Sequence, residues 1–123
     1  MNPLLNADLH CHSTVSDGTL SPEALAERAK ANGVELWSLT DHDEIGGQDR
    51  AIAAARQAGL PYLTGAEVSV TFANVTVHIL GLGFDHANPA LIEGLRHAGV
   101  IPDLRYIKLA FHFVSSNKFL IAK

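Results

Sequence analysis

Short apolar segments alternate with alanine-rich helical segments along the first half of the chain, and this alternation constrains the fold more than any other feature. Residues 4–11 and 34–40 are predicted strands, whereas residues 23–32 and 48–58 are predicted helices. Strands that alternate with helices of this length favour βαβ units and a largely parallel sheet. The sequence therefore predicts an α/β fold.

Capping and turn residues mark the ends of these helices. Ser21 offers a capping hydroxyl, and Pro22 follows it at the first helical position. Gly33 comes after the first helix and Gly59 after the second, where glycine commonly ends a helix. These residues therefore predict where the first helix begins and where both helices end.

A short strand, a hairpin and a third helix are predicted after the second helix. Residues 61–65 form the strand, and the alternating runs 67–72 and 75–82 flank residues 73–74 as the two strands of the hairpin. The third helix begins at an Asn-Pro pair and covers residues 88–96.

The length of the hairpin loop decides which side chains share a face. With a two-residue loop, Ser69 lies opposite His78, and Glu67 lies diagonal to His78 on the same polar face. The other face is apolar and is predicted to be buried. Its residues are Val68, Val70, Phe72, Val75, Val77 and Ile79.

Composition limits the class of protein. A chain of 123 residues has the length of one domain or of part of a larger one. No uncharged apolar run reaches the roughly 18 residues that cross a bilayer, so no membrane span is predicted. The N-terminus lacks the basic and apolar regions of a secretory signal, and the single cysteine cannot form an intrachain disulfide. A cytoplasmic location is the expectation.

Charge divides the chain into two parts. Residues 1–95 carry twelve acidic and four basic side chains, whereas residues 96–123 carry one acidic and five basic side chains. We therefore predict a main domain over residues 1–95 and a divergent basic tail over residues 96–123. An acidic body argues against a DNA-binding groove built from lysine and arginine.

A first candidate site lies at the end of the first predicted strand. The two-residue period of a strand places Asp8, His10 and His12 on one face and Cys11 on the other. Two imidazoles on one face can bind the same metal ion, and Asp8 could orient one of the rings. The alternative is a pair of surface histidines. Cys11 is predicted to pack in the core.

A second candidate site lies where the first two strands end. Asp17 is in the loop after the first strand, and Thr40-Asp41-His42-Asp43 directly follows the second. Ligands of parallel α/β folds bind at the carboxyl ends of the strands, so Asp17 and His42 are candidate ligands. The alternative is a solvated turn that caps the next helix.

Glu67 and His78 form the third candidate pair, because both lie on the polar face of the predicted hairpin. The alternative is that both side chains are only solvated. The remaining histidines, His86, His97 and His112, fit no ligand geometry and are predicted to be surface residues.

Taken together and in this order, His10-x-His12, Asp17, the Thr-Asp-His-Asp segment with His42, Glu67 and His78 resemble the N-terminal motifs of the PHP (polymerase and histidinol phosphatase) superfamily. Residues 8–18 are especially similar to the branch of small PHP phosphoesterases related to ribonuclease AM and nucleoside 3′,5′-bisphosphate phosphatases. The similarity covers roughly residues 6–95.

The resemblance implies a distorted (β/α)7 barrel that holds up to three divalent ions, commonly Mn, Fe or Zn. By position, His10, His12 and Glu67 would share a first ion, Glu67 and His78 a second, and Asp17 and His42 a third. The aspartates on either side of His42 would support or cap rather than bind metal. Such ions polarise phosphoryl oxygens and lower the pKa of water to give hydroxide near pH 7. The implied substrate is a phosphorylated small molecule or a nucleic-acid end.

The sequence departs from the family in its last quarter. The later histidine and the C-terminal Asp-x-His of the family are not found here, and a closed barrel takes roughly 250 residues. We therefore expect an incomplete barrel from a truncated or rearranged gene product, with fewer than three ions.

Three functional hypotheses follow. The leading one is a metal-dependent phosphoesterase. The second is a non-catalytic metal-binding fragment. The third is an interaction module that self-associates through an open sheet edge and residues 106–114. The missing C-terminal ligands weaken the first hypothesis relative to the other two.

Overall fold

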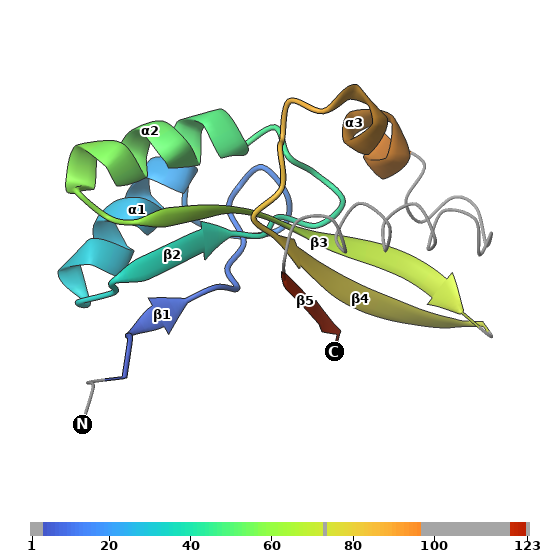
Figure 1. Cartoon of the computed structure of the whole chain (residues 1–123), viewed down its shortest axis with the longest axis horizontal. Coiled ribbons are helices and arrows are strands. Elements are labelled where there is room, and N and C mark those ends of the chain that lie inside the picture. The colour runs from blue at the N-terminus through green and yellow to red at the C-terminus, as the bar shows by residue number, and fades with distance from the viewer. Residues whose placement is uncertain (1–3, 73, 97–118, 123) are drawn as a thin grey trace.

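The computed structural model describes residues 4–72, 74–96 and 119–122, which form one five-stranded sheet and three helices (Figure 1). In chain order the elements are β1 (Ala7–Asp8), α1 (Pro22–Ala31), β2 (Leu36–Leu39), α2 (Gln48–Ala58), β3 (Tyr62–Phe72), β4 (Val75–Leu82), α3 (Pro89–Arg96) and β5 (Phe119–Ala122). The α/β fold predicted from the sequence is confirmed. Within the described residues, no helix combines the length and apolar character that a membrane crossing requires.

The sheet is mixed, with strand order β1-β2-β3-β4-β5. β1, β2 and β3 run parallel, as predicted, whereas β4 is antiparallel to β3 and β5 is antiparallel to β4. The antiparallel return of β4 is the hairpin that the sequence predicted, whereas β5 was not predicted as a strand. A two-residue turn joins β3 to β4, and so short a connection allows only an antiparallel return.

β3 is one continuous strand of 11 residues, not the separate strand and hairpin arm that the sequence predicted. Its first part pairs with β2 through residues 62–64, and from Gly65 onward it pairs with β4. A Cβ on Gly65 would overlap Ser38 Oγ and would lie 2.7 Å from the carbonyl oxygen of Leu39. Glycine at this position therefore lets β3 pass close to the end of β2 before it continues into the hairpin.

The predicted register of the hairpin is confirmed. Ser69 is opposite His78, and Asn74 takes a left-handed conformation with φ of 63° in the turn. Burial of the apolar hairpin face is confirmed only in part, since Ile79 is 9% exposed but Val75 is 61% exposed. The reason is position: α1 and α2 cover the β1–β2 side of the sheet, and the turn end of the hairpin extends beyond them (Figure 1).

The helix boundaries follow the predicted caps. The side chain of Ser21 accepts a hydrogen bond from the backbone N–H of Ala24 at 3.2 Å, at the start of α1. Gly59 ends α2 in the left-handed conformation with φ of 61°. Asn88 Oδ1 accepts from the backbone N–H of Ala90 at 2.9 Å, at the start of α3.

The core lies between β2 and the two helices α1 and α2. Trp37 and Leu39 of β2 are fully buried. The small residues of the two helices allow close packing on these side chains; they are Ala26, Ala29, Ala51 and Ala55. Cys11 is half-buried and packs against this core, and Trp37 Nε1 donates a hydrogen bond to its sulfur at 3.2 Å. The core therefore holds the ends of β1 and β2, from which the candidate ligands extend.

Candidate metal centre

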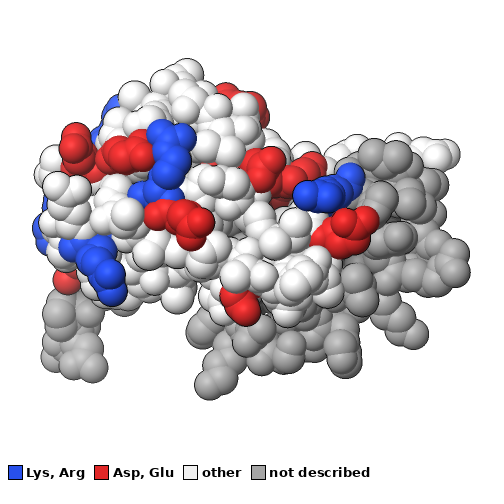
Figure 2. Space-filling view, turned by 90° about the horizontal axis from the view of Figure 1, so that it is seen from above, with Lys and Arg blue, Asp and Glu red and all other residues white. Residues whose placement is uncertain are grey.

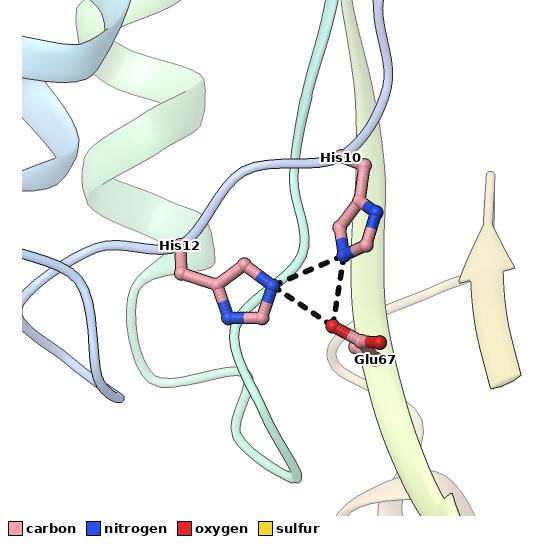
Figure 3. A group of neighbouring side chains, drawn as sticks. All are labelled: His10, His12 and Glu67. Atoms are coloured by element: carbon pink, nitrogen blue, oxygen red, sulfur yellow. Dashed lines mark hydrogen bonds and ion pairs between the residues drawn. The ribbon is translucent and has the colours of Figure 1, made fainter. Parts of the chain in front are cut away.

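His10 and His12 point toward Glu67 on β3 from the segment that follows β1 (Figure 3). The Nε2 atoms of the two histidines lie 3.1 Å apart, and each lies 2.8 Å from Oε2 of Glu67. Glu67 is 5% exposed. One buried carboxylate oxygen and two imidazole nitrogens therefore face a common point.

The backbone between the two histidines is held against the end of β2. Thr40 donates its N–H to the carbonyl oxygen of Cys11 at 2.9 Å, and the N–H of Cys11 donates to Thr40 Oγ1 at 3.2 Å. Cys11 thereby faces the core while His10 and His12 face the other side. The predicted alternation is correct here, although β1 itself ends at Asp8 and the histidines lie beyond it.

The predicted role of Asp8 is wrong. Its carboxylate accepts a hydrogen bond from the backbone N–H of His10 at 3.4 Å and makes no hydrogen bond with an imidazole of the described residues. The physical reason is that β1 ends here, so the chain turns and presents its backbone, rather than the ring of His10, to the carboxylate.

Asp17 reaches the centre from the loop between β1 and α1. Its Oδ1 lies 3.0 Å from Nδ1 of His12, and its Oδ2 lies 3.7 Å from Nε2 of His42. Gly18 follows, and a Cβ there would overlap the carbonyl oxygen of His12. The loop therefore needs glycine beside Asp17 to pass so close to the histidine segment.

Backbone hydrogen bonds fix Glu67 beside His42. The N–H of Glu67 donates to the carbonyl oxygen of Asp41 at 3.0 Å, and the N–H of Asp43 donates to the carbonyl oxygen of Glu67 at 2.9 Å. Asp43 Oδ1 also accepts from the N–H of Ser69 at 2.7 Å. The segment after β2 thus continues the parallel pairing with β3 and places Nε2 of His42 3.7 Å from Oε2 of Glu67.

His78 completes the set from β4. Its ring lies edge-on to that of His42, with ring centroids 5.0 Å apart, and its Nδ1 lies 3.3 Å from Ser69 Oγ. Since Ser69 and His78 are paired across the strands, Glu67 is diagonal to His78, as the sequence predicted.

All six sequence-predicted residues therefore meet at one place. They form three overlapping groups in which the possible ligand atoms lie within 4.8 Å of one another: His10, His12 and Glu67; His12, Asp17 and His42; and His42, Glu67 and His78. The family resemblance implies that His42 shares an ion with Asp17 alone, whereas the structure also places His42 beside Glu67 and His78.

Both carboxylates carry a lowered pKa. Burial acts to raise the pKa of Glu67, but the hydrogen bond from His10 and the charges of His10, His42 and His12 outweigh it. Partial desolvation of the Asp17 carboxylate acts to raise its pKa, but the charges of His12 and His42 and the hydrogen bond with His12 lower the pKa by more. Both groups are therefore ionised near neutral pH, which is the form that binds cations.

The geometry of His12 fits a cation at this centre. Its Nδ1 lies 3.0 Å from Asp17, and its Nε2 lies 2.8 Å from Glu67. A neutral imidazole has one N–H and one lone pair, so it can satisfy only one of two carboxylates. Either a proton or a metal ion must compensate the second contact. Imidazole nitrogen and carboxylate oxygen are together the donor set of Zn, Mn and Fe sites.

Two serines beside this centre were not predicted from the sequence. Ser13 and Ser16 donate hydrogen bonds to the buried carboxylate of Asp41. Serine has no distinctive sequence signal in a loop. Their position next to the candidate histidines was the available clue.

The remaining histidines are not part of the six-residue centre that the structure describes. His86 is half-buried, and its Nε2 lies 2.8 Å from Oδ1 of Asp49, away from the six-residue centre. His97 and His112 fall outside the described residues, as does most of the predicted basic tail. On the face shown in Figure 2, acidic and basic side chains are interspersed and form no single basic patch.

Comparison with known proteins agrees with this geometry. The model of the PHP domain family matches residues 8–117. A 3′,5′-nucleoside bisphosphate phosphatase of Chromobacterium violaceum is 52% identical over 93 residues, covering 76% of this chain and 33% of that protein. A 5′-3′ exoribonuclease of Haemophilus influenzae is 42% identical over 102 residues, covering 83% of this chain and 37% of that protein. The chain thus spans only part of the length of these relatives.

Solved structures show the same fold. An amidohydrolase from Chromobacterium violaceum, solved with bound sulfate and no metal, has a TM-score of 0.72 and 53% identity over 74% of this chain and 32% of its own. A protein assigned as a metal-dependent phosphoesterase, from Bifidobacterium adolescentis, has a TM-score of 0.71 and 35% identity over 77% of this chain and 33% of its own. The resemblance found in the sequence is confirmed, and the chain belongs to the PHP domain family.

Proposed function

We propose that this chain is a metal-dependent phosphoesterase of the PHP type that hydrolyses phosphate esters of nucleotides or oligonucleotide ends. The observation that carries the proposal is the convergence of four imidazoles and two ionised carboxylates into three overlapping groups. A cluster of neighbouring metal ions requires ligand side chains that are shared between adjacent sites, and these three groups share such side chains.

Each residue has a defined part in the proposal. His10, His12 and Glu67 would hold one ion, and Glu67, His42 and His78 would hold a second. Asp17, whose side chain is 66% exposed, lies at the solvent side of the third group. When bound, divalent ions polarise phosphoryl oxygens and stabilise charge on the leaving oxygen. They also supply positive charge that the acidic body of residues 1–95 lacks.

The substrate class rests on the relatives. One relative is named for nucleoside bisphosphates and another for RNA. Both of these compounds contain a phosphate ester attached to a nucleoside. The sulfate bound by the structural relative has the shape and charge type of a phosphate group. We propose divalent ions of Mn, Fe or Zn, fewer than the three that the family can hold, as in the sequence hypothesis, and a cytoplasmic location.

The test combines metal content with turnover. We would measure bound metal per chain and the Mn2+-dependent release of phosphate from adenosine 3′,5′-bisphosphate. His10→Ala and His42→Ala are each expected to lower release at least about 100-fold, because loss of a group that only orients a metal ligand already costs about 10–100-fold. His86→Ala is the matched control, since His86 pairs with Asp49 outside the centre and its loss leaves release unchanged.

The outcomes separate the three hypotheses. Metal-dependent release that is lost in both ligand variants supports the phosphoesterase. Bound metal without release favours the non-catalytic metal-binding fragment. A chain that binds no metal and sediments as a large oligomer favours the interaction module, which self-associates through its sheet edge.

A further inference from the structure

Asp41 is a buried carboxylate that lies beside the metal centre without being part of it. It is 1% exposed and belongs to none of the three ligand groups. Its Oδ1 accepts hydrogen bonds from the N–H of Ser13 at 2.7 Å and from Ser16 Oγ at 2.7 Å, and its Oδ2 accepts from Ser13 Oγ at 2.8 Å. A buried charge is tolerated only when it is well hydrogen-bonded, and this one is.

These three bonds anchor the loop that carries Asp17. The loop folds back on its own start, since the N–H groups of Ser16 and Gly18 both donate to the carbonyl oxygen of Ser13, at 3.1 Å and 2.8 Å. Asp17 itself is exposed, so burial does not hold its side chain in place. The bonds to Asp41 therefore hold the loop from which this exposed carboxylate reaches His12.

The backbone of Asp41 joins two more parts of the centre. Its carbonyl oxygen accepts the N–H of Glu67 at 3.0 Å, and the next residue in the chain is His42. One residue thus ties together the loop of Asp17, the histidine after β2 and the shared carboxylate on β3. These three segments are distant from one another in the sequence.

We propose that Asp41 is a positioning residue that holds Asp17 against His12 and His42, and thereby sets the affinity of the ion bound by these three side chains. This inference rests on the proposed metal-dependent function. It goes beyond that function by assigning control of one ion to a side chain that does not bind metal. The carboxylate acts through hydrogen-bond geometry, with Ser13 and Ser16 as its partners.

The test uses the full chain and Mn2+ alone. Asp41→Ala removes all three bonds and is expected to weaken Mn2+ binding at one site about 10–100-fold, measured by titration calorimetry. Asp41→Asn is the conservative variant: its amide oxygen replaces Oδ1, and the hydroxyl of Ser13 can turn to accept from the amide nitrogen. Asp41→Asn is therefore expected to recover most of the affinity. If the negative charge of Asp41 alone raised the Mn2+ affinity, Asp41→Asn would bind Mn2+ as weakly as Asp41→Ala.

Two further variants keep the test informative if Asp41→Ala folds poorly. Ser16→Ala removes one bond to Asp41, together with a longer contact of 3.4 Å between Ser16 Oγ and Asp17 Oδ1, and is expected to weaken the same site by a smaller factor than Asp41→Ala. Ser21→Ala removes the cap of α1, which lies outside the anchor, so it is expected to lower thermal stability without changing Mn2+ affinity.

A second readout needs no metal. In the metal-free chain, hydrogen exchange of the Gly18 amide is expected to speed up at least about tenfold in Asp41→Ala and Ser16→Ala, because the loop loses its anchor. Unchanged Mn2+ affinity and unchanged Gly18 exchange in these variants would overturn the inference while leaving the proposed function intact. A parent chain that binds none of Mn2+, Fe2+ and Zn2+ would overturn both.

Discussion

The helix-covered part of the sheet and the turn end of the hairpin differ sharply in burial. β2 lies beneath α1 and α2, and its residues Trp37 and Leu39 have no exposed surface. The hairpin of β3 and β4 extends away from these helices, and Val75 near its turn is 61% exposed (Figure 1). Burial of a side chain such as Trp37 or Leu39 therefore contributes more to the free energy of folding than does an apolar side chain near the turn.

The metal centre lies where these two regions meet. His10, His12 and His42 leave the ends of the covered strands, while Glu67 and His78 belong to the hairpin. The difference in burial indicates that the packed region holds in place the backbone segments that carry His10, His12 and His42. The hairpin supplies ligands at its base, where β3 still pairs with the segment after β2.

The largest expected effect on stability comes from shortening one side chain in the packed region and comparing it with one near the turn of the hairpin. Leu39→Ala removes a fully buried side chain and is expected to cost about 2–5 kcal/mol of the free energy of unfolding. Val75→Ala, at an exposed position, is expected to change it by less than about 0.5 kcal/mol. Denaturant unfolding measures both values, and similar losses in the two variants would contradict the contrast in packing.

The reactivity of Cys11 tests how well the packed region excludes water. Burial of the thiol, with further contributions from the charges of Asp8 and Asp41, raises the pKa of Cys11 to about 11 from 9.0. The thiolate fraction near pH 8, and with it the rate of alkylation by iodoacetamide, should fall about 100-fold relative to the unfolded chain. The neutral thiol is favoured in the folded state, so its contribution to stability is present below pH 9 and is lost as the pH rises toward 11. Equal alkylation rates in folded and unfolded chains would refute this.

A substitution at Gly65 tests the position at which β3 leaves the helix-covered part of the sheet and enters the hairpin. Gly65→Ala brings a Cβ against Ser38 and the backbone of Leu39 and is expected to cost about 1–3 kcal/mol. Gly94→Ala is the matched control, because a Cβ there meets no atom within 4 Å and α3 should gain about 0.5–1 kcal/mol. Thermal unfolding of the two variants should therefore shift in opposite directions.

The smallest expected effect concerns the outer surface of the packed region. Arg50 of α2 donates two hydrogen bonds of 2.7 Å to the carboxylate of Glu23 on α1, and these bonds lower the pKa of Glu23 to about 2. A lowered pKa adds stability above the ordinary value of 4.5, and this stability is lost as the pH falls toward 2. Glu23→Gln should be slightly less stable than the parent at pH 7, because exposed ion pairs contribute little. The difference should vanish near pH 2, and a difference that persists there would need another cause.

Local sequence signals predicted the helices and the hairpin well. Ser21, Gly59 and Asn88 act at the backbone of their own helix ends, so their effect requires no tertiary contact. The turn at Asn74 likewise sets the register of β3 and β4 by itself. The length of β3 was not predicted, because pairing with β2 on one side and β4 on the other joins two apparent strands into one.

The candidate ligands were found because their residue types and order are distinctive, and their convergence followed from strand ends that lie at one edge of the sheet. The sequence by itself determined the helix caps, the hairpin register and the identity of the six side chains, since each depends on near neighbours or on residue chemistry. Only the tertiary structure decided that Asp8 bonds a backbone amide, that His42 is shared between two groups and that Asp41 anchors the loop of Asp17. Those contacts join residues distant in sequence, and their geometry exists only once the strands pair and the core is packed.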